Sequence, residues 1–212
     1  FLLNASKAGH TGSLDPFATG LLPLCFGEAT KFSKFLLDAD KTYVATFILG
    51  KKSSTGDAYG QISLVKDASD LSFEDLKSSL KNFEGVQKQV PPMFSALKYK
   101  GERLYNLARR GEVVERKSRD ICVRSIDIHD HRINRLRSQV EIDITLVVSK
   151  GTYIRSIAID LGRKLKVGAY VSSLRRLNSG PFIESDMIEL KTLESLREDN
   201  KFDLLDEFLK PP

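Results

Sequence analysis

One aspartate, Asp15, stands in a glycine-rich run that could hold a carboxylate for catalysis. The run extends from Gly9 to Gly20, directly before an apolar segment, and has the sequence GHTGSLDPFATG. Glycines allow backbone conformations and close approaches that a Cβ would block, and Pro16 disfavours the α region at Asp15. A carboxylate held in this way is preorganised for nucleophilic or acid–base chemistry. The simpler interpretation is a turn, because Asp-Pro and small polar residues are common in loops that do no chemistry.

Positive charge is concentrated in the second half of the chain. Residues 1–97 are neutral overall, residues 98–183 carry a net charge of +10, and residues 184–212 carry −5. The densest part, which we call the basic segment, interleaves Tyr99 and Tyr105 with Lys98, Lys100, Arg103, Arg109, Arg110, Arg116, Lys117 and Arg119. Basic side chains neutralise phosphates and aromatic rings stack on bases, so the pattern favours nucleic-acid binding. The alternative is an ordinary solvated basic surface.

A second candidate site residue, Arg155, lies at a predicted junction between a strand and a helix. Apolar and polar residues alternate over 140–148, which predicts a half-buried strand. Residues 149–156, SKGTYIRS, follow, and then apolar residues at helical spacing up to Gly168, a stop signal. An arginine at the start of this helix could pair with a buried carboxylate or bind a phosphate, since its planar fork suits both. The alternative is a surface arginine.

The remaining pattern is α+β without regular βαβ repeats. It predicts strands at 41–50, 61–65, 121–128 and 169–177. Ser72, with Asp75 three residues later, predicts the start of a helix. Residues 129–137 are polar and are predicted to be a loop that joins strands 121–128 and 140–148 as a hairpin, and an acidic helical tail follows the last strand. We expect one continuous unit over residues 1–212.

The composition narrows the class of protein. With 41% hydrophobic and 29% charged residues among 212, the chain is typical of a soluble globular protein, and it has no apolar stretch of transmembrane length. Cys25 and Cys122 lie in apolar stretches and are expected to be buried thiols of a reducing compartment. His129 and His131 have no third partner in their loop, so no metal site is predicted. Asp15 is not part of an Asp-x-Asp motif, which argues against a magnesium-dependent hydrolase with Asp15 as nucleophile.

Five longer strings occur in order along the chain: GHTGSLDPFATGLLPLCFGEATKFSKFL, DKTYVA, VPPMFSALKYKGERLYNLARRGE, SKGTYIRSIAIDLG and VSSLRRLNSGPF. Together they resemble the bacterial tRNA pseudouridine-55 synthases of the TruB family, over almost the whole chain. The resemblance implies a mixed, mainly antiparallel sheet flanked by helices and loops around a central RNA-binding cleft. It also implies an isomerase that converts the T-loop uridine at tRNA position 55 to pseudouridine, without metal or organic cofactor. The implied setting is a cytoplasmic monomer that acts on the tRNA T-stem-loop and not on a membrane.

Three residues match the family's active site. Asp15 matches the essential aspartate, which acts as nucleophile or as acid and base while the base is detached and reattached. Tyr43 in DKTY matches the tyrosine that stacks on the target base, and Arg155 in GTYIR matches the arginine that pairs with the carboxylate. A base must leave its stack to react, so an aromatic side chain supplies a replacement stacking surface. Without the resemblance, Tyr43 would be taken for a strand residue that packs in the core.

Further matched residues concern the pocket and the RNA. Leu174 matches an apolar residue that lines the uracil pocket, although a strand leucine is ordinarily a core residue. His10 and Lys31 match motif positions near the RNA. Residues 91–119 match an RNA-clamping insertion, whose matched cations in this chain are Lys98, Lys100, Arg103, Arg109 and Arg110.

The chain also departs from the family. The strand, helix and Lys-Pro motif that usually precede the GHTG turn are not in the sequence, so we expect the catalytic domain to be incomplete at its N-terminus. The small C-terminal RNA-binding PUA domain of many members is also not in the sequence. An alternative function is a tRNA-folding chaperone that uses the same basic surface without essential catalysis.

Overall fold

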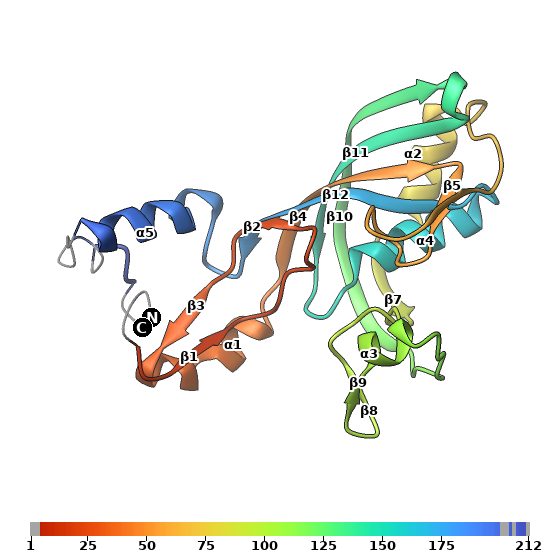
Figure 1. Ribbon diagram of the computed structural model, residues 1–212. Helices are drawn as coiled ribbons and strands as arrows, with labels where there is room; N and C mark the ends of the chain where they lie inside the picture. The colour runs from red at the N-terminus through yellow and green to blue at the C-terminus, as the bar shows by residue number, and fades with distance from the viewer. Residues whose placement is uncertain (1–4, 200–203, 205–206, 211–212) are drawn as a thin grey trace.

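The chain folds around a six-stranded sheet, which the computed structural model shows in Figure 1. The structure describes residues 5–199, 204 and 207–210. Across the sheet the strands follow the order β2 (Thr19–Gly20), β12 (Ala169–Ser179), β4 (Lys41–Leu49), β11 (Gln139–Val148), β10 (Arg119–Asn134) and β7 (Gly85–Gln89). All neighbours are antiparallel except β2 and β12, which are parallel. The predicted mixed, mainly antiparallel sheet is therefore confirmed.

Two helices, α2 (Phe73–Lys81) and α4 (Ile154–Lys164), cover one face of this sheet (Figure 1). The apolar residues of β11 alternate with half-exposed ones and join the helices in the core, as the sequence pattern predicts. The core includes Leu76 and Leu80 from α2 and Ile157, Ala158 and Leu161 from α4. Burial of these side chains therefore fixes α4, the helix that carries Arg155, on the sheet.

The predicted start of α2 is confirmed as a capping box. The Ser72 hydroxyl accepts a hydrogen bond from the Asp75 backbone N–H at 3.1 Å, and the Asp75 carboxylate accepts one from the Ser72 N–H at 3.3 Å. Two backbone donors that the helix itself cannot satisfy thus find partners. The predicted strands at 41–50, 61–65 and 169–177 correspond to β4, β6 (Ile62–Leu64) and β12.

Smaller elements lie around the sheet. An arm of β1 (Ala8–His10), β3 (Leu24–Phe26), η1 (Gly27–Lys31) and α1 (Ser33–Leu37) projects to the left in Figure 1. The predicted acidic tail includes η3 (Glu184–Asp186) and α5 (Leu190–Glu198). Residues between β7 and β10 extend below the sheet in the same view and form β8 (Lys98–Tyr99), β9 (Glu102–Arg103) and α3 (Leu104–Arg109). A short β5 (Lys51–Ser53) pairs with β6.

Two predictions are wrong. Residues 129–134 are not a loop but the end of β10, and the hairpin turns at η2 (Arg135–Arg137) and Ser138, whose φ is +51°. Strand pairing with β11 continues here although these polar residues give no apolar alternation. Cys122 is only half-buried, whereas Cys25 is buried as expected, and both are free thiols. Within the described residues, no helix is long and apolar enough to cross a membrane.

Candidate active site

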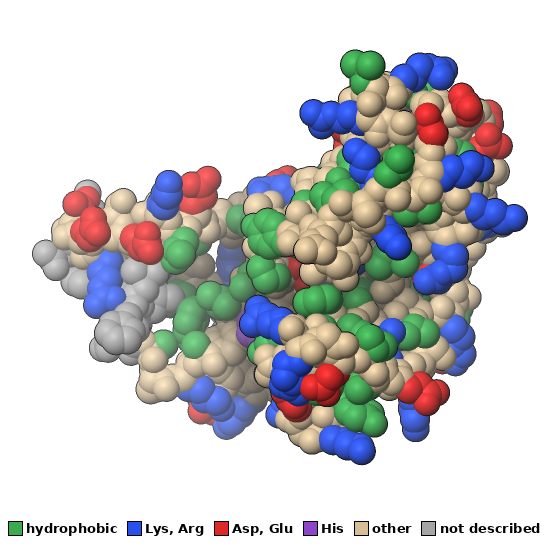
Figure 2. Space-filling view, turned by 45° about the vertical axis from the view of Figure 1, so that its right-hand side comes forward, with side chains coloured by type: hydrophobic (Ala, Val, Ile, Leu, Met, Phe, Trp, Pro, Cys, Tyr) green, Lys and Arg blue, Asp and Glu red, His purple; other side chains and the backbone are tan. Residues whose placement is uncertain are grey.

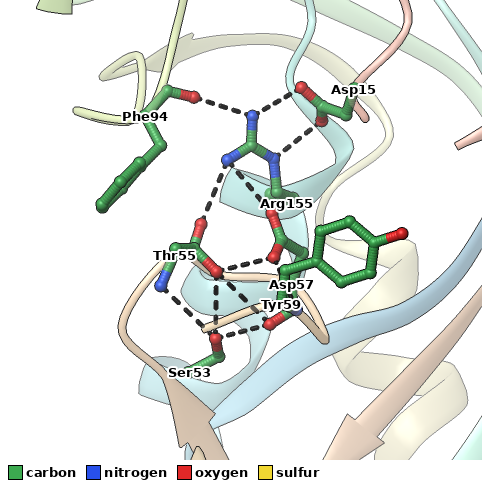
Figure 3. Close-up of polar contacts among 7 residues, drawn as sticks. All are labelled: Asp15, Ser53, Thr55, Asp57, Tyr59, Phe94 and Arg155. Carbon is green, nitrogen blue, oxygen red and sulfur yellow. Dashed lines mark hydrogen bonds and ion pairs between the residues drawn. The ribbon is translucent and has the colours of Figure 1, made fainter. Parts of the chain in front are cut away.

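The guanidinium of Arg155 holds the carboxylate of Asp15 through two hydrogen bonds (Figure 3). Nε donates to Oδ2 at 2.8 Å and Nη2 donates to Oδ1 at 2.7 Å. Arg155 is 3% exposed, while the Asp15 side chain is 27% exposed. This two-bond arrangement fixes the orientation of the carboxylate as well as its charge. The structure therefore brings two of the predicted site residues together and leaves the carboxylate partly accessible.

The remaining donors of Arg155 are also engaged. Nη1 donates to the Thr55 carbonyl at 3.1 Å, and Nη2 donates to the Phe94 carbonyl at 2.8 Å. Nη1 also lies 3.5 Å from Oδ2 of Asp57. A guanidinium has five N–H donors in one plane, and these contacts use each of its three nitrogens. The arginine is thus held in one position by three separate parts of the chain.

Asp57 is a site residue that the sequence analysis missed. Its carboxylate accepts a hydrogen bond from the Thr55 hydroxyl at 2.6 Å and another from the Tyr59 backbone N–H at 3.0 Å (Figure 3). It is buried, and its contact with Nη1 of Arg155 places a second carboxylate beside the guanidinium. The turn around it has the sequence SSTGDAYG, with the same mixture of glycine, small polar residues and one aspartate as the Asp15 turn. That composition is the signal that could have found it.

Substitution Asp57→Asn is expected to lower the single-turnover rate by on the order of 10- to 100-fold, because Arg155 loses one of its two carboxylates and is held less firmly. The free energy of unfolding should fall by about 1–3 kcal/mol, since a buried charged hydrogen-bond acceptor is lost. Urea unfolding and single-turnover kinetics measure the two effects. Asp70→Asn is the matched control, because Asp70 is exposed and pairs only at the surface, with Arg135 at 3.5 Å. A rate for Asp57→Asn equal to that of the control would contradict the role given to Asp57.

Backbone contacts to β12 hold the turn that carries Asp15. The Asp15 carbonyl accepts a hydrogen bond from the Ala18 N–H at 2.8 Å, which closes a tight turn. Gly20 then pairs with Arg176 in the parallel ladder, with a φ of +98°. A Cβ at Gly20 would lie 2.2 Å from the Arg176 carbonyl oxygen, so only glycine fits there. The glycine-rich run therefore allows the close backbone approach that the sequence indicates.

Tyr43 and Leu174 lie on the face of the sheet that packs against α4. Tyr43 is opposite Arg176 in the β4–β12 ladder, and Leu174 is opposite Ala45. Leu174 is buried, and Tyr43 is half-buried against the core. Burial raises the pKa of Tyr43, and the negative charge of Asp15 adds to the rise, while the guanidinium of Arg176 opposes it. The phenol of Tyr43 therefore stays protonated at neutral pH.

Arg176 is a second residue that the sequence analysis missed. It is 1% exposed, and its Nε and Nη2 donate to the carbonyls of Leu21 and Gly12 at 2.6 and 3.1 Å. These two carbonyls lie on either side of Asp15 in the sequence, so Arg176 ties both ends of the Asp15 turn to β12. Its position two residues after Leu174 in a strand places the two on one face, which is a signal for burial.

The residues matched to RNA contacts lie away from the sheet. His10 and Lys31 are exposed residues of the arm, where His10 accepts a hydrogen bond from the Gly12 N–H at 3.3 Å and Lys31 pairs with Glu28. In the basic segment, Lys98, Lys100, Arg103, Arg109 and Arg110 are all exposed. Arg110 already pairs with Glu102 and Glu112, both at 2.6 Å. Figure 2 shows Lys and Arg side chains spread over the visible face rather than gathered in one patch.

A cavity of about 670 Å³ lies next to the Arg155 site. Thr55 and Phe94, whose carbonyls bind Arg155, line it together with Ile159 and Asp160 of α4 and residues after α3, but Asp15 does not. Among the described residues, no group of three His, Cys, Asp or Glu side chains could hold a metal ion. His129 binds the Thr145 hydroxyl at 2.6 Å, and the ring of His131 packs against Phe73 at 5.9 Å.

Comparison with known proteins decides the family. The family model for the N-terminal domain of the TruB family pseudouridylate synthases matches residues 1–154, and the model for the tRNA pseudouridylate synthase B C-terminal domain matches residues 155–212. The chain belongs to the TruB family. The boundary between the two matches falls inside α4, so Asp15 and Arg155 come from different family models. The predicted family membership and the predicted isomerase class are thereby confirmed.

Named relatives agree with this membership. The tRNA pseudouridine synthase B of Pseudomonas aeruginosa (strain UCBPP-PA14) is 49% identical over 213 residues, and that of Pseudomonas putida (strain GB-1) is 46% identical over 211. Each alignment covers 100% of this chain and 67% of the relative. TruB members convert uridine to pseudouridine in tRNA, so tRNA modification is the activity of this family.

Solved structures share the fold. The structure of a Cbf5-Nop10-Gar1 complex matches with a TM-score of 0.71 and 32% identity, over 98% of this chain and 51% of that chain. The structure of an H/ACA RNP bound to a substrate RNA containing 2′-deoxyuridine matches with a TM-score of 0.65 and 28% identity, over 94% and 48%. The chain therefore spans about half the length of these structural neighbours. Their similarity supports the predicted α+β pseudouridine synthase fold.

Proposed function

We propose that this chain isomerises the T-loop uridine at tRNA position 55 to pseudouridine, with Asp15 as the catalytic carboxylate. The two-bond pairing of Asp15 with the buried Arg155 is the observation that carries the proposal. Arg155 holds in one orientation a carboxylate that must act as nucleophile or as acid and base. The partial exposure of Asp15 leaves it open to a substrate.

The reaction needs no oxidant and no added group, because its product is an isomer of its substrate. The bond between N1 of uracil and C1′ of the ribose breaks, and a bond between C5 and C1′ forms. C5 loses a proton and N1 gains one. Asp15 serves the detachment and the reattachment, whereas Tyr43 offers a stacking surface to the flipped base and Leu174 an apolar wall. Because its raised pKa keeps the phenol of Tyr43 protonated, the proton that C5 loses must go to another acceptor, and the Asp15 carboxylate is the one we propose.

The tRNA T-stem-loop is the partner we propose, bound by a monomer in the cytoplasm. The exposed cations of the basic segment support binding of a polyanion, and two free thiols fit a reducing compartment. His10 and Lys31 extend the proposed RNA surface onto the arm. A tRNA-folding chaperone would use the same surface, but it would give tRNA binding without a modified nucleoside.

Position-specific mapping of the product tests the proposal. Unmodified tRNA is incubated with the protein, and pseudouridine is located by mass spectrometry of nuclease fragments. We expect one pseudouridine, at position 55. Modification at another position would contradict the T-loop assignment, and bound tRNA without any pseudouridine would favour the chaperone.

Removing two unpaired cations of the basic segment should weaken tRNA binding. Within the described part of the chain, neither Lys98 nor Lys100 forms an ion pair, so both are available to phosphates. For Lys98→Ala/Lys100→Ala we expect the negative slope of log affinity against log salt concentration to become shallower by about 1–2, because roughly two fewer counterions are released. Filter binding at several salt concentrations measures the slope. The control is Lys66→Ala/Lys77→Ala, at exposed lysines outside the segment, and an equal slope for both pairs would contradict the prediction.

A further inference from the structure

A buried glutamine, Gln89, links the start of the insertion to the helical turn that carries Arg155. It ends β7 and is 3% exposed. Its Nε2 donates to the Tyr153 carbonyl at 3.1 Å, and its Oε1 accepts from the Tyr153 N–H at 2.8 Å. We propose that Gln89 is a positioning residue that sets the place of Arg155, and through it that of Asp15. The inference rests on the proposed function, because its main readout is the isomerisation rate.

The backbone before Arg155 depends on this contact. Tyr153 is the N-cap of α4, and its side chain makes no capping hydrogen bond. Gly151, two residues earlier, has a φ of +74°, so the connection from β11 turns sharply just before the helix. Gln89 binds both polar groups of the Tyr153 main chain, as a partner strand would. A buried amide with both sides satisfied holds its partner firmly, because any displacement leaves buried polar groups unpaired.

The residues that follow Gln89 lie alongside the first turn of α4 and make hydrogen bonds with it. The Val90 carbonyl accepts from the Ser156 hydroxyl at 3.4 Å, and the Phe94 carbonyl accepts from Nη2 of Arg155 at 2.8 Å. Pro91 and Pro92 lie between these contacts and restrict the backbone. One short segment therefore fixes both the main chain before Arg155 and its guanidinium, and Gln89 is its buried anchor.

The other end of the insertion reaches the same place. Arg119, which pairs with Gln89 in the β7–β10 ladder, has its guanidinium 4.8 Å from the centre of the Tyr153 ring and donates to the Gly151 carbonyl. Both ends of the stretch that contains the basic segment thus contact Tyr153. RNA bound by that segment would therefore be linked through these contacts to the backbone beside Arg155. Arg119 is itself a cation that a phosphate could bind, whereas Gln89 is neutral and buried. Gln89 is therefore the residue to test.

Substitution Gln89→Met removes both hydrogen bonds and nearly keeps the side-chain volume. We expect the single-turnover rate at saturating tRNA to fall by on the order of 10- to 100-fold, since a shift of about 1 Å in a catalytic group costs that much. The dissociation constant for tRNA should change by less than about threefold, because the exposed cations remain. The matched control is Gln139→Met. Gln139 is 4% exposed and binds Lys51 and Glu141 at 2.7 and 2.8 Å, and its loss should lower stability and leave the rate unchanged.

Three further measurements separate positioning from a general loss of structure. In an Arg155→Lys background, Gln89→Met should cost less than about threefold in rate, because residues that act through one another are not additive. Gln89→Glu keeps the acceptor for the Tyr153 N–H, and its rate should lie between those of Gln89→Met and the unmodified protein. Hydrogen exchange at the Tyr153 amide should become faster in Gln89→Met, whether or not the reaction is followed.

The outcomes distinguish this inference from the proposed function. An unmodified protein that makes no pseudouridine contradicts the proposed function, and the Tyr153 exchange rate then still tests the position of the backbone. A Gln89→Met rate within about twofold of an active unmodified protein contradicts the inference alone. Unchanged exchange at Tyr153, or an equal loss of rate in the Arg155→Lys background, also overturns it.

Discussion

Arg155→Met is expected to abolish most activity and to destabilise the fold. The substitution leaves Asp15 and the carbonyls of Thr55 and Phe94 without this donor, and it leaves the buried Asp57 without its cationic partner. Removing one partner of a buried ion pair costs about 3–5 kcal/mol of unfolding free energy. The single-turnover rate should fall by on the order of 10³ or more, as is typical when a charge-stabilising group is lost from an active site. Urea unfolding and release of tritium from uridine C5 measure the two effects.

Two variants serve as controls for Arg155→Met. Arg163→Met alters an arginine of the same helix that is 74% exposed and pairs only with Asp160 among the described residues, so it should change stability by less than about 0.5 kcal/mol. Arg155→Lys keeps the charge but loses the planar fork, and it should fall between Arg155→Met and the unmodified protein. Equal rates and stabilities for Arg155→Met and Arg163→Met would contradict the structural account of the site.

Residue periodicity was sufficient for the elements whose burial follows one pattern. The alternation in β11 and the helical spacing in α4 appear directly in the sequence, because each element has one buried and one exposed face. The end of β10 was missed because it does not have this pattern. Residues 129–134 are polar except for Ile133 and show no apolar alternation, and their extended form comes from pairing with β11, which a local pattern does not contain.

The contact between Asp15 and Arg155 joins residues 140 positions apart, so no local pattern predicts it. The family resemblance supplied the pairing, and the residues alone gave only two separate candidates. Asp57 was missed because its burial and its proximity to Arg155 arise where the turn between β5 and β6 meets β12 and α4. Arg176 was missed because an arginine in a strand is usually exposed, and only the contacts with the Asp15 turn make its burial favourable.

Asp15→Asn is expected to have the largest effect on the rate. Asparagine nearly keeps the shape of the side chain, but it has no negative charge and cannot act as a carboxylate nucleophile or base. We expect the single-turnover rate to fall by at least about 10⁴-fold, as when a nucleophile is removed from other enzymes. The tRNA dissociation constant should change by less than about threefold, because the basic segment is unaltered. Asp130→Asn, at an exposed aspartate that pairs with Arg132, is the matched control.

Tritium release from tRNA labelled at C5 of uridine 55 tests the assignment of Asp15 most directly. The measurement uses excess protein and compares the unmodified protein, Asp130→Asn and Asp15→Asn at equal tRNA occupancy. We predict complete release with the first two proteins and no release above background with Asp15→Asn. Release that persists in Asp15→Asn would contradict the claim that this carboxylate, held by Arg155, carries out the isomerisation.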